Sequence, residues 1–110
     1  MSKSFKPDLS ALILGALESG PKHGYAIAQA IRQAGAKSLK LGEGQLYPVL
    51  HRLEQDGFVA AEWETQEGKP SRKVYALTET GSKRLVDKRK KWAEHVKSVS
   101  AVLSLTAPEV

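Results

Sequence analysis

A proline inside a leucine-periodic segment, EGQLYPVLHRLEQDGFV at residues 43–59, is the feature that most constrains this chain. The spacing i, i+3, i+4, i+7 predicts a helix rather than a strand, and it is kept by Leu46, Val49, Leu50 and Leu53. The first four N–H groups of a helix have no intrahelical partner, so proline is tolerated there and is costly further in. We therefore expect the helix to begin near Gly44 or Gln45, with Pro48 in its first turn, and to end at Gly57.

Two shorter helices are predicted before this segment. Asp8 is placed to cap the first, whose apolar stripe spans residues 9–17 and ends at the Ser-Gly-Pro of residues 19–21. The second is expected from about His23 to Gln33, with Gly35 ending it. A polar connection with two isolated leucines follows, so the second and third helices form a helix-turn-helix candidate with a long turn.

The period of the pattern changes after Gly57. FVAAEWET (58–65) and KVYAL (73–77) are β-prone and are separated by QEGKPSR (66–72), which predicts a two-stranded hairpin with a basic tip. Trp63 is expected to pack within the hairpin or the core. A hairpin directly after a helix-turn-helix predicts a winged domain, and we call this hairpin the wing.

A long helix capped by Thr78 is predicted over residues 78–105. Positions alternating by four and three form a heptad-like seam, which is apolar apart from one arginine and consists of Leu85, Arg89, Trp92, Val96, Val99 and Leu103. Little of the same chain remains to cover it. The predicted fold class is thus mainly α with a small β-hairpin, with a winged helix-turn-helix domain over residues 1–77 and one C-terminal helix over residues 78–110.

The leucine stripe of the third helix must face the core, so other side chains project from it. Arginine and glutamine can contact base edges, and tyrosine and histidine can reach phosphates, which makes candidates of Gln45, Tyr47, His51 and Arg52. The wing adds Lys69, Ser71, Arg72 and Lys73. A net charge of +5 also favours a polyanionic partner. Double-stranded DNA is the expected partner.

Several other classes are disfavoured. The chain has no cysteine, and His23, His51 and His95 lack metal-ligand spacing. Because no phosphate-binding glycine motif or carboxylate pair is present either, we expect no enzyme, no metal and no cofactor. The N-terminal apolar run is too short to span a bilayer, and we expect a cytoplasmic protein with no membrane partner.

Three segments together resemble the PadR family of bacterial winged-helix transcriptional regulators. They are HGYAIAQAI, LYPVLHRLEQDGFV and EWETQEGKPSRKVYALTETG, and the resemblance runs from about Leu9 to Leu105. The chain looks like the short class, with one C-terminal helix. It departs where family members commonly carry a serine and a threonine before LYP, since Gly42 and Gln45 stand here, so a hydroxyl N-cap is missing.

The resemblance implies a homodimer that represses from an inverted-repeat operator, with each third helix in a major groove. It implies DNA contacts at His23, Tyr25, Tyr47, His51, Arg52 and the wing residues Lys69, Ser71, Arg72 and Lys73. Lys22 and Gln45 complete our set of candidate DNA contacts. It also implies a dimer interface at Leu9, Leu12, Leu85, Trp92, Val96, Val99 and Leu103. Some relatives release DNA on binding a small aromatic or hydrophobic effector, for which Trp92 is the candidate contact.

Each of these roles has an alternative. Tyr25 fits a packing residue as well as a phosphate contact, Trp92 fits an interface filler, and the basic run at residues 88–91 fits a solvated helix face. At the level of the whole chain, the alternative is a winged-helix protein-interaction module without specific DNA binding. Salt-dependent affinity for duplex DNA would distinguish the two.

Overall fold

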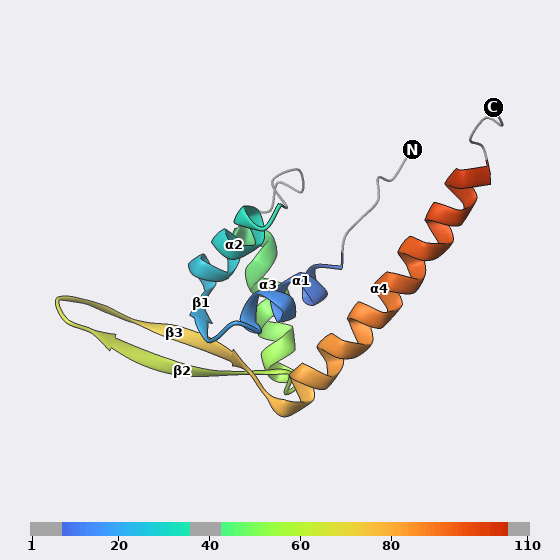
Figure 1. The fold of residues 1–110 in the computed structure, drawn as a ribbon. Helices are drawn as coiled ribbons and strands as arrows, with labels where there is room; N and C mark the ends of the chain where they lie inside the picture. Colours follow the sequence, from blue (N-terminus) through green and yellow to red (C-terminus); the bar gives the residue numbers. More distant parts are fainter. Residues whose placement is uncertain (1–7, 36–42, 106–110) are drawn as a thin grey trace.

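The computed structural model describes residues 8–35 and 43–105. Within these ranges the chain forms four helices and a three-stranded antiparallel sheet (Figure 1). In chain order the elements are α1 (Leu9–Leu17), β1 (Lys22–His23), α2 (Gly24–Gln33), α3 (Glu43–Gln55), β2 (Val59–Gln66), β3 (Lys69–Leu77) and α4 (Glu79–Leu105). This is the predicted class, mainly α with a winged helix-turn-helix domain and a C-terminal helix.

Local chemistry defines the ends of α1 and α2, where Asp8 and Gly35 have the expected roles. The Asp8 carboxylate caps α1 by accepting a hydrogen bond from the Ala11 N–H at 3.3 Å. His23 caps α2, and its Nδ1 accepts from the Ala26 N–H at 3.4 Å. Gly35 follows α2 with φ of +111°, a conformation that glycine adopts without a steric penalty. The connection over residues 36–42 lies outside the described residues.

The start of α3 differs from the prediction. The helix already includes Glu43, so Pro48 is its sixth residue and lies beyond the first turn. Proline there removes the hydrogen bond to the carbonyl of Gly44, but Gly44 is exposed and water can take the donor's place. Burial of the leucine stripe outweighs this local cost, since Leu46 and Leu50 are completely buried.

The end of α3 agrees with the prediction. Gly57 has φ of +83°, and the Phe58 N–H donates to the Leu53 carbonyl at 2.9 Å. Glycine in this left-handed conformation is the usual way to end a helix and turn the chain.

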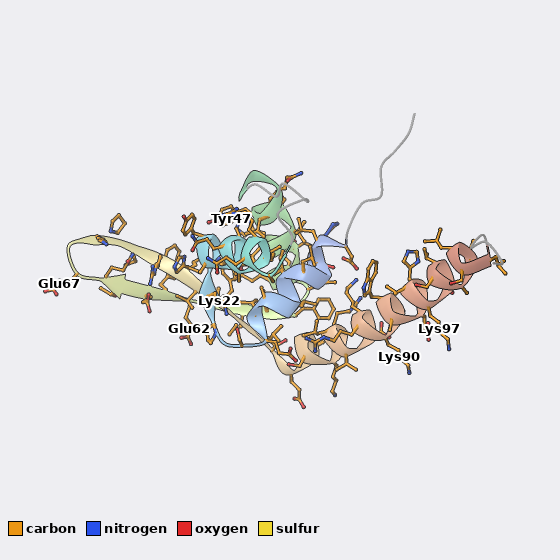
Figure 2. The ribbon with its side chains drawn as sticks, turned by 45° about the horizontal axis from the view of Figure 1, so that its top comes forward. Lys22, Tyr47, Glu62, Glu67, Lys90 and Lys97 are labelled. Atoms are coloured by element: carbon orange, nitrogen blue, oxygen red, sulfur yellow. The ribbon has the colours of Figure 1, made fainter. Side chains whose placement is uncertain are left out.

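The wing is longer than expected, and a third strand joins its sheet. β2 and β3 are joined at Glu67 and Gly68, where Gly68 has φ of +71°, and Glu67 lies at the far end of the wing (Figure 2). The predicted tip residues Lys69, Ser71, Arg72 and Lys73 therefore lie along β3. The unforeseen β1 pairs with β3, with Lys22 opposite Tyr75. Two residues are too few to show a period of two in the sequence.

One core holds the helices and the inner end of the sheet together. It consists of Ile13, Leu14, Leu17, Ile27, Ala28, Ile31, Leu46, Leu50, Leu53, Val59, Tyr75 and Leu85. The wing and α4 extend away from this core in different directions (Figure 1). Within the described ranges, no helix is both long enough and apolar enough to cross a membrane.

The first turn of α4 is fixed to the junction of α3 and β2. Thr78 Oγ1 accepts from the Gly81 N–H at 2.9 Å and donates to the Gly57 carbonyl at 2.7 Å. A Cβ at Gly81 would lie 1.9 Å from the Phe58 carbonyl oxygen. The backbones therefore approach at a distance that only glycine allows.

Candidate nucleic-acid interface

The side chains of α3 divide into three stripes, as a period of 3.6 residues requires. Leu46, Leu50 and Leu53 face the core. Gln45, Pro48 and Arg52 lie on the opposite side and are exposed. Between these two stripes lie Tyr47, His51 and Glu54, on the side of α3 that faces the wing. The Gln45–Arg52 stripe is thus open to a partner along the length of the helix.

Tyr47 connects α3 to the start of α2. A Cβ at Gly24 would lie 2.5 Å from the Tyr47 hydroxyl oxygen, so the phenol ring occupies the space that a side chain at position 24 would need. The Tyr47 ring also lies 6.3 Å from the His51 ring, centroid to centroid. The motifs HGY and LYP thus meet in one contact, in which the tyrosine of the second packs on the glycine of the first.

His23 and Tyr25 flank that glycine. Their rings are nearly parallel, at 5°, with centroids 6.4 Å apart. His23 is half-buried and caps α2, so part of its role is structural. Tyr25 is 50% exposed, and its hydroxyl accepts a hydrogen bond from Gln29 at 3.4 Å. Its exposure favours the partner-contact interpretation over the packing one.

An open depression of about 400 Å³ lies between α3, the start of α2 and the wing. We call it the α3–wing depression, and its lining residues are His23, Gly24, Tyr25, Tyr47, His51, Trp63, Arg72, Lys73 and Tyr75. Six of the predicted DNA-contact residues therefore meet around one surface feature. The prediction for Trp63 was wrong, because its side chain is 69% exposed and lines this depression.

Two of the wing cations already have partners. Lys73 Nζ lies 3.1 Å from Glu54 Oε1, and this hydrogen bond is the main reason that the pKa of Lys73 is raised. Lys73 Nζ also lies 5.4 Å from the centroid of the Tyr75 ring. Arg72 Nε lies 2.8 Å from Glu64 Oε1 across the β2–β3 ladder. Lys73 therefore connects the wing to α3, a role that sequence periodicity could not show.

The remaining predicted contacts lie outside the lining of the α3–wing depression. Lys69 and Ser71 are exposed along the outer part of β3. Lys22 is half-buried, and its Nζ donates to Ser19 Oγ at 2.8 Å, which holds it near the α1–β1 turn. Gln45 and Arg52 project from the opposite stripe of α3. The α3–wing depression thus brings together part of the predicted set, and these five residues lie outside it.

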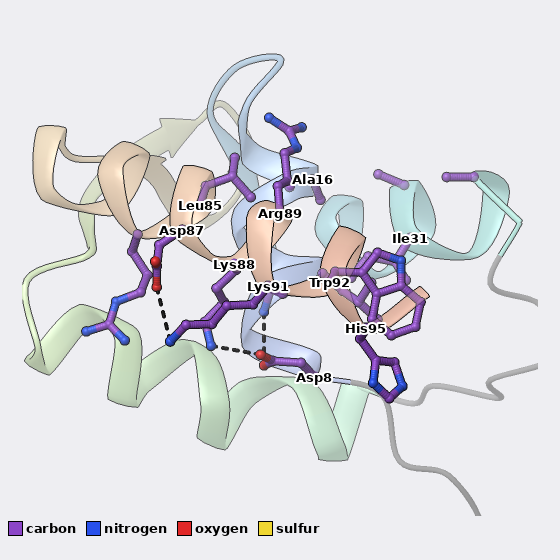
Figure 3. Close-up of a pocket in the computed structure, with 16 residues that line it drawn as sticks. Asp8, Ala16, Ile31, Leu85, Asp87, Lys88, Arg89, Lys91, Trp92 and His95 are labelled. Carbon is purple, nitrogen blue, oxygen red and sulfur yellow. Dashed lines mark hydrogen bonds and ion pairs between the residues drawn. The ribbon is translucent and has the colours of Figure 1, made fainter. Parts of the chain in front are cut away.

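A second feature is a cleft of about 740 Å³ between α1, α2 and α4 (Figure 3). Small side chains such as Ala11, Gly15 and Ala30 leave the space, and Trp92 and His95 line it from α4. Their rings are 5.4 Å apart, centroid to centroid. Leu12 also lines the cleft, and both Leu9 and Leu12 pack against the core while half-buried.

The predicted seam of α4 is open over most of its length. Leu85 is buried in the core, whereas the exposed fractions are 54% for Trp92, 42% for Val96, 42% for Val99 and 65% for Leu103. Lys90 and Lys97 project from the side of α4 that points away from α1 (Figure 2). The exposed seam is thus an apolar face on a helix whose other side is charged.

Two ion pairs hold α4 against α1. Lys88 Nζ lies 2.7 Å from Asp8 Oδ2. Partial burial works against ionisation of Asp8, but hydrogen bonds from Lys88, Ser10 and the Ala11 N–H outweigh it and lower the pKa of the carboxyl. Arg89 makes two hydrogen bonds to Glu18, at 3.0 and 2.5 Å, which lower the pKa of Glu18. The one polar seam residue therefore has a partner within its own chain.

Metal binding has no support among residues 8–35 and 43–105, where no three histidine, cysteine, aspartate or glutamate side chains are grouped to hold an ion.

Comparison with known proteins gives a consistent result. A family model for the transcriptional regulator PadR-like family matches residues 13–87, which is more than half of the chain. Transcriptional regulator Rv3488 of Mycobacterium tuberculosis is 34% identical over 85 residues, covering 77% of this chain and 76% of that protein. The negative transcriptional regulator PadR of Bacillus subtilis is 32% identical over 79 residues, and the match spans 72% of this chain but 43% of PadR.

Solved structures agree with these matches. A PadR family transcription regulator from Clostridium difficile superposes with a TM-score of 0.76 at 29% identity, covering 86% of this chain and 97% of that one. Bacillus subtilis PadR, solved in complex with operator DNA, superposes with a TM-score of 0.66 at 32% identity, covering 72% of this chain and 45% of PadR. The residues matched by the family model, 13–87, include α3 and the wing.

Proposed function

This chain belongs to the transcriptional regulator PadR-like family, and from that premise we propose that it is a dimeric, sequence-specific DNA-binding repressor. Members of this family are transcriptional regulators and not enzymes. The observation that carries the proposal is the exposed stripe of α3, Gln45 to Arg52, on a helix whose Tyr47–His51 flank faces a wing that bears Lys69, Arg72 and Lys73. The solved complex of Bacillus subtilis PadR with operator DNA supports this choice of partner.

In the proposed complex α3 enters the major groove with its exposed stripe facing the bases. Gln45 and Arg52 have the hydrogen-bonding groups for base edges, and arginine is suited to the two acceptors of guanine. Lys69 and Arg72 contact phosphates, which add affinity without sequence information. Because each cation that contacts a phosphate releases a counterion from the DNA, this part of the affinity falls as the salt concentration rises.

The homodimer is proposed to form through the exposed seam of α4 together with α1. α4 exposes apolar side chains at heptad spacing, namely Trp92, Val96, Val99 and Leu103. A second α4 has the same spacing and can bury them in a coiled-coil-like interface. Leu9 and Leu12 lie on α1 near the cleft and extend the interface. Such a dimer presents two copies of α3 to an operator with two-fold symmetry, whose half-sites lie about one helical turn apart.

The cleft beside Trp92 supports a second role, in which a planar hydrophobic effector changes the affinity for DNA. Its volume of about 740 Å³ is sufficient for a small aromatic molecule. Release of DNA by such a molecule would make the chain a ligand-controlled repressor. Quenching of tryptophan fluorescence across a panel of aromatic compounds tests this role.

The test of the main proposal is fluorescence anisotropy with a labelled duplex from upstream of the protein's own gene. A scrambled duplex of the same composition is the control, and both are titrated at two salt concentrations. Tight binding that survives excess scrambled duplex and weakens steeply with salt supports a specific regulator. Absence of binding to either duplex at low salt would contradict it and favour the protein-interaction alternative.

A further inference from the structure

Trp63 is the large aromatic side chain of the wing, and folding does not explain its position. It is 69% exposed and lies opposite Lys73 in the β2–β3 ladder. Neighbouring side chains in such a pair lie on the same face of the sheet. Because Lys73 bonds to Glu54 of α3, this face of the wing is the one turned toward α3. Trp63 therefore projects into the α3–wing depression from the side opposite His51.

We propose that Trp63 contacts the sugar-phosphate backbone of the DNA strand that runs between α3 and the wing. This inference rests on the proposed DNA-binding function and adds a residue that neither the sequence motifs nor the charge pattern singled out. It assigns to the depression one occupant, a backbone segment of duplex DNA, with Trp63 as the apolar part of its wall.

The geometry of α3 places a strand there. A major groove about 12 Å wide is nearly filled by a helix with its side chains, so the flanks of the helix face the two backbones. If the Gln45–Arg52 stripe faces the bases, the Tyr47–His51 stripe faces one of the strands. The wing lies beyond that stripe, so the same strand passes through the depression and meets Trp63.

The chemistry of the depression fits a sugar-phosphate segment. An indole offers a flat apolar face to a deoxyribose and one N–H donor to a phosphate oxygen. In a duplex the flat faces of the bases stack on one another, so the indole cannot stack on a base. Glu54 would repel a phosphate, but Lys73 at 3.1 Å compensates its charge and fixes the distance between wing and helix. Tyr25 and His51, both exposed, add polar groups around the same space.

A neutral contact has a distinctive signature. Loss of a phosphate-binding lysine lowers the slope of log affinity against log salt by about one, because one fewer counterion is released. Loss of Trp63 removes apolar cover and one hydrogen bond but no charge. Affinity should therefore fall while the salt slope stays the same, for specific and random duplexes alike.

The test combines two readouts on the full chain. Anisotropy titrations with the labelled upstream duplex and a scrambled duplex compare wild type, Trp63→Ala and Trp63→Phe over a series of salt concentrations. We expect Trp63→Ala to bind both duplexes about tenfold more weakly with an unchanged salt slope, and Trp63→Phe to retain part of the affinity. Lys69→Ala is the charged comparison and should lower the slope.

Intrinsic fluorescence gives the second readout, because the chain has two tryptophans. Duplex should protect wild-type emission from acrylamide, and the protection should disappear in Trp63→Phe, where Trp92 is the remaining emitter. If duplex binds but Trp63→Ala matches wild type, or if bound duplex leaves acrylamide quenching unchanged, the inference is wrong and the DNA-binding proposal stands. If wild type binds no duplex at all, both are overturned.

Discussion

Two glycines determine how closely the parts of this molecule approach. Gly24 lies against the Tyr47 ring, and Gly81 lies against the Phe58 carbonyl. Each belongs to a motif that the sequence displays, HGY and LTETG, but only the structure gives the reason for them. The small residue in each motif provides a backbone-to-neighbour contact that a methyl group would block.

Gly81→Ala and Gly24→Ala should both destabilise the fold. The added Cβ would lie 1.9 Å from a backbone oxygen at position 81 and 2.5 Å from the tyrosine hydroxyl at position 24. Overpacking of this kind costs about 1–3 kcal/mol, with the larger loss expected where backbone must move. Gly44→Ala is the matched control, since nothing lies within 4 Å of its added Cβ. Thermal unfolding should show a Tm below that of wild type for Gly81→Ala and Gly24→Ala but not for Gly44→Ala. Equal Tm values for the three variants would refute this explanation.

Arg52 and Lys69 should differ in how they contribute to binding. Arg52→Ala should cost about 1–3 kcal/mol on the specific duplex and little on random DNA, because a base-edge contact is lost. Lys69→Ala should weaken both duplexes and reduce the salt dependence. Competition binding with specific and random duplexes measures the difference. This division of roles would be contradicted if the loss of affinity for the specific duplex, divided by the loss for random duplex, were the same in both mutants.

The sequence predicted which side chains are exposed better than it predicted which residues they contact. Periodicity placed Gln45, His51 and Arg52 on the exposed side of α3, where the structure has them. It could not show that Lys73 is paired with Glu54, because that ion pair depends on how the wing folds back on α3. Trp63 was missed for a related reason, since alternation along a strand does not tell which face of an extended hairpin is covered.

At the element scale α4 is attached to the domain by its first turn and by two ion pairs to the α1 region. Thr78 and Gly81 fix its start, and Lys88 and Arg89 pair with Asp8 and Glu18. Beyond Arg89 the helix extends from the core with Trp92 and the valines of its seam exposed. The N-terminal part of α4 is thus attached to the domain, and the seam side chains of its C-terminal part are exposed.

Acid should loosen this attachment. The folded-state pKa values of Asp8 and Glu18 lie below their ordinary values, so each pair contributes stability above the unfolded-state pKa of about 4 and loses it as pH falls through the lower folded-state pKa. The double variant Asp8→Asn with Glu18→Gln should have a lower Tm than wild type at pH 7, and asparagine keeps the N-cap. Melting curves from pH 7 to pH 2 should converge at the acid end. A constant difference at every pH would rule out the ion pairs as its cause.

The wing and α3 show which element boundaries were predictable. Glycines marked the ends of α2 and α3 correctly because a left-handed φ is a local requirement. The start of α3 was placed too late because core burial of Leu46 and Leu50 overrides a local proline cost. The turn of the wing was placed over seven residues and consists of two, since ladder pairing extends to Lys69 opposite Gln66, and lysine is a poor strand former.

At the scale of the whole molecule the exposed seam of α4 is the basis for assembly. Val99→Lys should yield a folded monomer, because the charge would be buried in the proposed interface. Ala101→Lys adds the same charge on the opposite side of α4 and should leave a dimer. Sedimentation equilibrium distinguishes the two, and thermal unfolding confirms that both are folded. A dimer in both variants would remove the seam from the interface.

In the proposed complex, two copies of α3 bind an operator with two-fold symmetry. The most direct measurement is selection of binding sequences from a random duplex pool by the full chain, followed by sequencing. We expect an enriched inverted repeat whose half-site centres lie about one helical turn, roughly 10 base pairs, apart. Enrichment of a motif without two-fold symmetry, or no enrichment at all, would contradict it.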